Sequence, residues 1–321
     1  MVRDARIGVV LIGRNEGERL VVSLASVMAE AHRAVYVDSG STDDSVAAAR
    51  AVGAEVVTLD PARPFTAARA RNEGFDRLRQ DDALTYVQFI DGDCELQAGW
   101  MEEAAAFLDA HPQVAVVCGR RRERFPDASI WNKLIDREWD TPVGEAKACG
   151  GDAMMRVSAL EAVNGFNPRL IAGEEPELCV RLRQAGWKVH RIDAEMTLHD
   201  AALTRFSQWW RRTVRGGHAF AEGAAIHGAP PERHKVTETR RALIWGFGLP
   251  LVAVVGAITV SPWMAAVLLL WPIQMVRMMV RGYSPEQAVF FVLGRVPEAI
   301  GASGYWFKRL TNRDSRIIEY K

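Results

Sequence analysis

A long run without charged residues sets the strongest limit on how this chain can fold. From Ala242 to Val276 the sequence contains no Asp, Glu, Lys or Arg. A single helix of that length would reach about 50 Å, whereas the hydrocarbon core of a bilayer is about 30 Å thick. Ser261 and Pro262 divide the run near its middle, and a proline suits the first turn of a new helix. The run therefore predicts two membrane helices, at about 242–260 and about 262–280.

Positive charges flank both outer ends of this predicted hairpin. Arg240 and Arg241 precede it, and Arg277 and Arg281 follow it. Because Lys and Arg gather on the cytosolic side of membrane helices, both ends are expected in the cytosol, at the inner membrane. A helical pair buried in a soluble core is the alternative, but so long a charge-free run disfavours it. A third apolar stretch, at about 286–310, carries charges and is expected to be an interfacial or re-entrant helix.

The chain before this run alternates strand-like and helix-like segments. Short β-branched runs predict the strands, and apolar residues at helical spacing predict the helices between them. The alternation indicates an α/β fold with a Rossmann-like, mostly parallel sheet flanked by helices. We expect a catalytic domain at 1–235 and a C-terminal α-helical membrane region at 236–321. The expected strands are Ile7–Ile12, Ala34–Val37, Glu55–Leu59, Leu84–Ile90, Val114–Cys118 and Lys188–Ile192, and the expected helices are Gly17–Met28, a segment capped by Ser41 or Thr42 that ends near Val52, Phe65–Leu78 and Gln97–Leu108.

Composition excludes some classes of function. Lys+Arg and Asp+Glu are both 40 in 321 residues, so no overall positive charge favours nucleic acid as a partner. Cys94, Cys118, Cys149 and Cys179 lie far apart and form no CxxC pair, which argues against a zinc site or a disulfide framework and fits a reducing compartment. The N-terminal residues lead straight into a strand without a signal-peptide pattern, so we expect the catalytic domain in the cytosol.

Two carboxylates, Asp91 and Asp93, follow the fourth expected strand and are separated by Gly92. The glycine lets the backbone turn sharply, so both carboxylates can converge on one divalent cation that also holds phosphate oxygens. By itself the tripeptide indicates only a turn. Polar residues also follow the first two strands, at Gly13–Glu16 and Asp38–Ser41, and ligands bind at this edge of a parallel sheet. Together these segments predict a nucleotide site, although the GxGxxG and GxxxxGK[ST] motifs are absent.

A second acidic cluster lies at Gly173–Glu177. Pro176 suits the first position of a helix, which would place Glu175 at the N-cap, near the positive end of the helix dipole. A carboxylate held there suits a general base that takes the proton from an acceptor hydroxyl. Helix capping alone is a sufficient alternative role for this side chain.

Two segments between these centres allow more than one interpretation. Arg120–Arg124 is a dense basic run that fits a solvated face, or a contact with anionic lipid or a phosphorylated acceptor. Asp127–Gly144, with Trp131 and Trp139, is expected to be an irregular loop. Such a loop can cover an acceptor, although tryptophans more often serve packing.

Six segments, in order, are LIGRNEGERL, VDSGSTDDS, ARARNEGF, FIDGDCEL, CGGDAMMRVSALEAVNGFN and GEEPELCVRLRQAGW. In order and spacing they resemble the motifs of the family 2 glycosyltransferases of the GT-A fold, over roughly residues 5–215. The resemblance implies a nucleotide-sugar donor, a divalent cation (Mg²⁺ or Mn²⁺) and an inverting displacement at the anomeric carbon. The chain departs from the family at Ser39, where members often have Asp, and at Glu174–Glu175, where they usually have Glu-Asp.

The resemblance also implies roles for individual residues. Glu175 matches the general base, with Glu174 as the alternative, and Asp91 and Asp93 match the metal-binding carboxylates. His199 is expected as a third metal ligand. Donor binding is implied for Arg14, Asn15, Glu16, Asp38, Ser39, Arg71, Asn72, Asp91, Arg211 and Arg212, and a place on the acceptor side for Gly151 and Asp152.

These expectations together describe a membrane-anchored, cytosol-facing inverting glycosyltransferase. Its expected acceptor is lipid-linked, of the polyprenyl type, in polysaccharide or glycoconjugate assembly such as exopolysaccharide biosynthesis. A polyprenyl-phosphate glycosyltransferase is one alternative, and a catalytically silent membrane scaffold that keeps the fold is another. A soluble sugar-1-phosphate nucleotidyltransferase is disfavoured by the membrane run and by the lack of a glycine-rich N-terminal loop.

Overall fold

The computed structural model describes residues 6–80 and 84–312. The chain divides into two compact units, of which the first consists of Met1–Ala128 and Ile135–Ala202 and the second of Ser129–Leu134 and Leu203–Lys321. The first unit therefore ends earlier than residue 235, where the sequence placed the end of the catalytic domain. The two boundaries differ because helix α8 (Phe206–His227) packs against helix α13 (Arg295–Leu310) and so belongs to the second unit.

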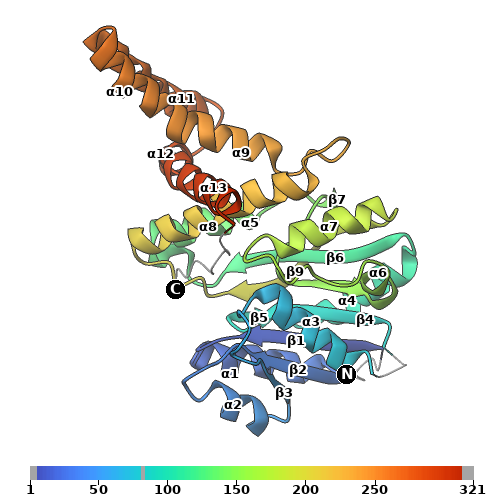
Figure 1. Cartoon of the computed structure of the whole chain (residues 1–321). Helices are drawn as coiled ribbons and strands as arrows, with labels where there is room; N and C mark the ends of the chain where they lie inside the picture. The colour runs from blue at the N-terminus through green and yellow to red at the C-terminus, as the bar shows by residue number, and fades with distance from the viewer. Residues whose placement is uncertain (1–5, 81–83, 313–321) are drawn as a thin grey trace. The chain divides into compact units, whose positions relative to one another are not determined.

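The described part of the first unit is built on one nine-stranded sheet. Its strands are β1 (Ile7–Gly13), β2 (Arg33–Asp38), β3 (Glu55–Thr58), β4 (Tyr86–Asp91), β5 (Cys94–Leu96), β6 (Val114–Glu123), β7 (Gly144–Ala146), β8 (Ala153–Arg156) and β9 (Lys188–His199). They lie in the order β3-β2-β1-β4-β8-β6-β9-β5, with β7 beside β9 (Figure 1). The strands from β1 to β4 are mutually parallel, as is the pair of β6 and β9, whereas β8 is antiparallel to its neighbours. The predicted mostly parallel α/β sheet is confirmed.

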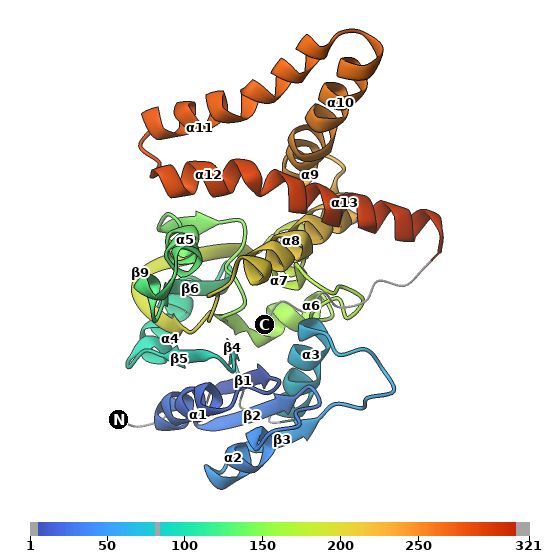
Figure 2. The same cartoon turned by 90° about the vertical axis from the view of Figure 1, so that its left-hand side faces the viewer.

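Helices cover both faces of this sheet. Helices α1 (Glu18–Glu30) and α2 (Ser45–Ala51) connect β1 to β2 and β2 to β3 on one face of the sheet, and α3 (Ala67–Leu78) connects β3 to β4 on the other face (Figure 2). Helix α3 lies very close to the strands, because a Cβ atom at Gly74 would approach Val10 Cγ1 to 2.5 Å. This part also contains α4 (Trp100–Ala110), the 3-10 helix η1 (Pro126–Ala128), α6 (Val157–Ala162) and α7 (Glu174–Gln184), while α5 (Ile130–Trp139) belongs partly to each unit.

The ends of β1, β2 and β4 lie side by side at one edge of the sheet. Gly13 is paired with Asp38, and Ile12 is paired with Asp91. Beyond the strands, the Ser39 N–H donates to the Gly13 carbonyl at 3.0 Å, and the Gly92 N–H donates to the Ile12 carbonyl at 2.7 Å. The predicted convergence of three polar strand ends is therefore confirmed.

Some expected elements differ from the structure. Helix α5 occupies most of Asp127–Gly144, which we expected to be an irregular loop, because an apolar side of this segment packs inward, with Ile135 only 3 % exposed. Helix α2 begins after Asp44, so neither Ser41 nor Thr42 caps it. Ser41 and Thr42 instead form hydrogen bonds with Asn15, in the loop after β1. Strands β6 and β9 both run further than the patterns indicated, to Glu123 and His199, because they pair with each other along this whole extension.

The second unit is helical. Besides α8 and α13 it contains α9 (Val236–Ala242), the π-helical η2 (Leu243–Gly248), α10 (Leu249–Thr259), the 3-10 helix η3 (Pro262–Leu269), α11 (Leu270–Val280) and α12 (Pro285–Leu293). Helices α8 and α13 cross closely, since a Cβ atom at Gly217 would lie 2.0 Å from the Glu298 carbonyl oxygen. The expected single interfacial helix at 286–310 is instead two helices, α12 and α13, that meet at Gly294.

Two continuous helical stretches, Val236–Thr259 and Pro262–Val280, are long and apolar enough to cross a membrane. They turn back on each other near Ser261, as the sequence predicted (Figure 2). Their apolar side chains point outward, and Ile258 and Trp263 are 80 % and 85 % exposed. Insertion into a membrane remains a prediction.

Candidate active site

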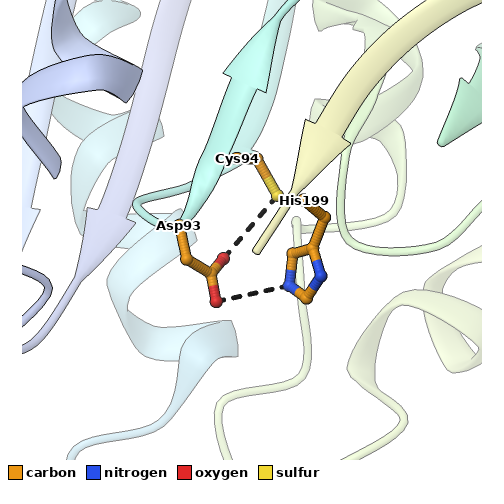
Figure 3. Close-up of side chains that lie close together, drawn as sticks. All are labelled: Asp93, Cys94 and His199. Carbon is orange, nitrogen blue, oxygen red and sulfur yellow. Dashed lines mark hydrogen bonds and ion pairs between the residues drawn. The ribbon is translucent and has the colours of Figure 1, made fainter. Parts of the chain in front are cut away.

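Asp93, Cys94 and His199 gather beside the carboxyl end of β4 (Figure 3). Asp93 follows the turn at Gly92, and the antiparallel pairing of β5 with β9 sets Cys94 opposite His199. The His199 Nε2 atom lies 3.3 Å from Asp93 Oδ2, and the Cys94 thiol donates to Asp93 Oδ1 at 3.6 Å. His199 is the last residue of β9, which runs beyond the expected strand end at Ile192. The sequence indicated Asp93 and His199 as metal ligands, but it did not indicate that Cys94 lies beside them.

The surroundings of His199 favour its neutral form. Burial and the positive charge of Arg121 lower the pKa of His199, so the imidazole is neutral near pH 7, the form that ligates metals. Its other nitrogen, Nδ1, lies 3.8 Å from Oε2 of the buried Glu123. A carboxylate behind a histidine typically orients that ligand toward its metal. Oxygen and nitrogen donors at this spacing fit Mn²⁺, and the carboxylate also fits Mg²⁺.

Arg71 joins the end of β4 to α7. Its Nη2 atom lies 2.7 Å from Asp91 Oδ1, and its Nη1 atom lies 2.6 Å from Glu174 Oε1. The guanidinium also stacks over the Phe166 ring, 5.6 Å from its centroid. Burial lowers the pKa of Arg71, but the charges of Asp91 and Glu174 outweigh this effect and raise it above its usual value. Arg71 is not a solvated helix residue, because it is only 2 % exposed.

A second arginine, Arg121, lies beside the same carboxylate. It reaches Asp91 Oδ2 at 3.5 Å and Asp152 Oδ2 at 3.4 Å, and it lies 4.7 Å from the centroid of the Trp139 ring. Sequence reasoning missed it, because the basic run that contains it suggested a solvated face. The alternation of side chains along an extended β6 would have been the signal, since Arg121 and Arg122 point to opposite faces of the strand.

The basic run Arg120–Arg124 is only in part a solvated face, since Arg122 is exposed whereas Arg120 is buried. Arg120 is 6 % exposed and pairs with Asp136, Arg122 pairs with Glu195, and Arg124 pairs with Glu95. Each of these three cations has a carboxylate partner, and the alternative of a contact with anionic lipid or a phosphorylated acceptor stays a prediction.

Asp152 and Gly151 pack directly against Asp91. The carboxylate of Asp152 is fully buried and accepts the backbone N–H of Asp91 at 3.1 Å and the hydroxyl of Thr197 at 3.0 Å. A Cβ atom at Gly151 would lie 2.8 Å from Arg71 Nη2 and 3.0 Å from Asp91 Oδ2. The contacts of both residues are thus with the support of Asp91, while their predicted place on the acceptor side remains a prediction.

The loops after β1 and β2 bind to each other. The Asn15 N–H donates to the Ser41 hydroxyl at 3.0 Å, and the Thr42 N–H donates to Asn15 Oδ1 at 2.7 Å. Asp38 is 1 % exposed, and its carboxylate accepts the N–H groups of Gly40 and Ser41 at 3.0 and 2.9 Å. This carboxylate therefore fixes the shape of its own loop.

The other residues predicted to bind the donor occupy varied positions. Glu16 pairs with Arg19 at 2.8 Å, and the exposed Arg14 stacks over Phe65, 5.8 Å from the ring centroid. Ser39 is partly exposed at the same edge. The Asn72 amide exchanges two hydrogen bonds with the backbone of Phe166, at 2.7 and 2.9 Å, which ties α3 to the segment before α7. Arg211 and Arg212 lie on α8 in the second unit, and the predicted donor contacts of all these residues remain untested.

Glu174 and Glu175 are the first two residues of α7, which begins after Gly173. The expected N-cap position of Glu175 is therefore wrong. The left-handed backbone of Gly173, with φ of 77°, starts the helix one residue before Glu174. Glu174 pairs with Arg71, whereas Glu175 is 3 % exposed and accepts the Cys149 N–H at 2.7 Å and the Cys149 and Cys179 thiols at 2.9 Å each.

The α/β sheet, with Asp91, Asp93 and His199 at the carboxyl edge of its strands, has the architecture of the GT-A fold. Residues 9–163 match the family described as Glycosyl transferase family 2, and the chain belongs to that family. It is 33 % identical over 205 residues to the uncharacterized glycosyltransferase Mb0553 of Mycobacterium bovis, covering 60 % of this chain and 85 % of the relative.

Two further relatives have names that state a role. The chain is 27 % identical over 226 residues to the pre-mycofactocin glycosyltransferase of Mycobacterium tuberculosis, which covers 65 % of this chain but only 45 % of that relative. It is also 27 % identical over 263 residues to the succinoglycan biosynthesis protein ExoA of Rhizobium meliloti, covering 78 % of each. Among solved structures, the mannosyltransferase PcManGT from Pyrobaculum calidifontis, in complex with GDP-Man and Mn²⁺, has a TM-score of 0.63 at 18 % identity and covers 95 % of this chain and 88 % of its own. This likeness confirms the GT-A fold.

Proposed function

We propose that this protein transfers a sugar from a nucleotide-sugar donor to a lipid-linked acceptor, with inversion at the anomeric carbon. The observation that carries the proposal is the pairing of Asp93 with His199 at 3.3 Å, next to an Asp91 carboxylate that Arg71 holds at 2.7 Å. Nitrogen and oxygen ligands beside an acidic turn suit a cation that binds a diphosphate. Membership of glycosyl transferase family 2 supports the same reaction.

The proposed cofactor is a divalent cation, Mn²⁺ or Mg²⁺, held by Asp93 and His199 with Asp91 nearby. When bound, such a cation neutralises charge on the diphosphate leaving group. The presence of an imidazole favours Mn²⁺ over Mg²⁺, since Mg²⁺ prefers oxygen ligands and water. The solved mannosyltransferase structure with Mn²⁺ supports this choice.

Glu175 is the proposed general base. In the reaction its carboxylate accepts the proton of the acceptor hydroxyl as the acceptor oxygen bonds to the anomeric carbon and the bond to the diphosphate breaks. The adjacent Glu174 is less suited, because its charge is already paired with the Arg71 guanidinium at 2.6 Å, and taking up a proton would forfeit that pairing. Glu175, by contrast, accepts hydrogen bonds from the Cys149 N–H and from the thiols of Cys149 and Cys179, none of which carries a positive charge.

The proposed acceptor is lipid-linked because of the second unit. Apolar side chains along α10 and α11 are widely exposed, among them Ile258 at 80 % and Val280 at 82 %. Exposed apolar surface on this scale is unstable in water and fits a hydrocarbon environment. A catalytic unit held at the inner face of the membrane would meet acceptors carried on polyprenyl diphosphate, and the name of the succinoglycan relative is consistent with polysaccharide assembly.

The experiment uses the full chain in detergent or nanodiscs, incubated with Mn²⁺, a panel of nucleotide sugars and short-chain polyprenyl phosphate and diphosphate-linked acceptors. Mass spectrometry should detect an acceptor heavier by one sugar with one donor of the panel, and no such product with Asp93→Asn. A product on a water-soluble acceptor alone would refute the lipid-linked acceptor. Absence of any transfer by folded wild-type protein, across the whole panel, would favour a scaffold.

A further inference from the structure

Two cysteines that lie far apart in the sequence meet at one carboxylate oxygen in the fold. Cys149 Sγ and Cys179 Sγ each lie 2.9 Å from Glu175 Oε1. The two sulfurs and the carboxylate oxygen all lie within 4.8 Å of one another. The sequence spacing of the cysteines argued against a zinc site, but that argument considered neighbours along the chain only.

The backbone holds these three side chains in place. Glu175 and Cys179 are four residues apart on α7, so they project from the same face of the helix. Cys149 is fixed beside them, because its own N–H donates to Glu175 at 2.7 Å. Cys118, on β6, bonds to the Cys149 thiol and brings a third sulfur next to the group. The three donor atoms therefore come from two separate segments, α7 and the loop before β8.

Without a metal ion, hydrogen bonds to Glu175 hold these side chains together. Burial and hydrogen bonds to Cys118 and Cys179 raise the pKa of Cys149 well above its usual value. The hydrogen bond with Cys149 lowers the pKa of Cys179, but burial and the Glu175 carboxylate outweigh it and raise this pKa to about 12. Both thiols donate hydrogen bonds to the Glu175 carboxylate. A metal ion that binds thiolates releases such protons and takes their place.

We propose that Cys149, Glu175 and Cys179 form a second metal site, for a thiophilic divalent cation such as Zn²⁺. Two sulfurs and a carboxylate oxygen are ligands that zinc accepts, and a hard cation such as Mg²⁺ does not bind thiolates well. Cys149 is partly exposed, which gives an ion access from solvent, whereas Glu175 and Cys179 are buried. The site is distinct from Asp93 and His199, which use other side chains.

An ion at this site would also affect catalysis, an inference that rests on the proposed function. If Glu175 is the base, an ion bound to its carboxylate blocks proton transfer from the acceptor. Zn²⁺ would then inhibit the same enzyme that Mn²⁺ or Mg²⁺ activates at Asp93 and His199. Replacing Cys149 by Ser should weaken this inhibition at least tenfold.

The test uses Cd²⁺ as a spectroscopic substitute for zinc, with the purified full chain kept in a phosphine reductant. The wild type should develop the ultraviolet charge-transfer absorption of cadmium thiolates, saturating at one ion per chain. Cys149→Ser and Cys179→Ser should each lose most of this absorption, and Glu175→Gln should weaken binding. Asp93→Asn and Cys94→Ser are the matched controls and should keep the absorption.

Two results would overturn the site. One is a wild-type protein with four reactive thiols that shows no absorption, and the other is absorption that persists in both cysteine variants but disappears in Cys94→Ser. Circular dichroism of each variant identifies any that fails to fold, and Glu175→Gln then serves as the independent variant. If cadmium binds as expected but Zn²⁺ leaves transfer unchanged, the metal site stands and the placement of the base at Glu175 is refuted.

Discussion

Arg71 Nη2 lies 2.7 Å from Asp91 Oδ1, so a residue of α3 fixes the carboxylate at the end of β4. Because the same guanidinium reaches Glu174 at 2.6 Å, the end of the strand and the start of α7 share one buried cation. This link joins the proposed donor side of the site to the proposed acceptor side. The two sides should therefore respond together when Arg71 is changed.

Arg71→Lys tests this link. A lysine can pair with one of the two carboxylates but cannot span both, since its ammonium is a compact point charge. We expect the free energy of unfolding to fall by roughly 1–3 kcal/mol and donor affinity to fall with it. Arg77→Lys is the matched control, because Arg77 lies on the same helix but is exposed and pairs with Glu55. Chemical denaturation measures both variants, and equal effects would contradict a special role for Arg71.

The sequence predicted strands β1 to β4 well, because the patterns that indicate them lie within short stretches of the chain. The polar residues that follow β1, β2 and β4 can each be recognised from a few adjacent residues. The parallel pairing of the strands then brings these residues together at one edge of the sheet. Arg121 and Glu123 were missed because their partners, Asp91 and His199, lie on other strands, and the register of β6 with β9 decides the contact.

The start of α7 shows a different limit. Pro176 indicated that the helix begins at Pro176 itself, but it begins two residues earlier, at Glu174, after the left-handed Gly173. Gly173 before two acidic residues also indicated a helix start at Glu174, but our prediction gave more weight to Pro176. The meeting of Cys149 with Cys179 had no local signal, because it depends on how the loop before β8 packs against α7.

Gly151→Ala tests how closely the backbone packs against the site. The added methyl group would lie 2.8 Å from Arg71 Nη2 and 3.0 Å from Asp91 Oδ2, so the ion pair must shift. Because misplacement of about 1 Å is costly in catalysis, we expect transfer to fall roughly 10–100-fold while the fold is retained. Gly304→Ala, which meets nothing within 4 Å, is the control. Full activity in Gly151→Ala would show that this backbone has room to move.

Glu175→Gln and Glu174→Gln separate the proposed base from its neighbour. Glutamine keeps the shape of the side chain but cannot accept the proton, so Glu175→Gln should lower turnover by roughly 10²–10⁴-fold with donor affinity almost unchanged. Glu174→Gln should cost less turnover and more stability, because Arg71 loses a partner. Single-turnover kinetics decides between them, and the reverse order of effects would assign the base to Glu174. Glu175→Asp restores the residue usual in the family, and retained activity would support a base at this position.

The topology of the apolar hairpin gives a prediction about the membrane. With both ends in the cytosol, a cysteine placed at Ser261 should react with an impermeant reagent from outside intact cells. A cysteine placed at Arg205, before α8, should react only after the cells are opened. Both probes are made in a background in which the four native cysteines are replaced. Labelling of the Arg205 probe from outside would exclude the proposed orientation.

The most direct test of the central claim is calorimetric titration of the full chain with UDP and with GDP, in Mn²⁺ and in excess chelator. The wild type should bind one of the two nucleotides at least tenfold more tightly with Mn²⁺ than without it. Asp93→Asn, with an unchanged circular dichroism spectrum, should lose this difference, because the proposed cation has lost its carboxylate ligand. Nucleotide binding that is equally tight in chelator, or that keeps its Mn²⁺ dependence in Asp93→Asn, would contradict a metal-dependent donor site at Asp93 and His199.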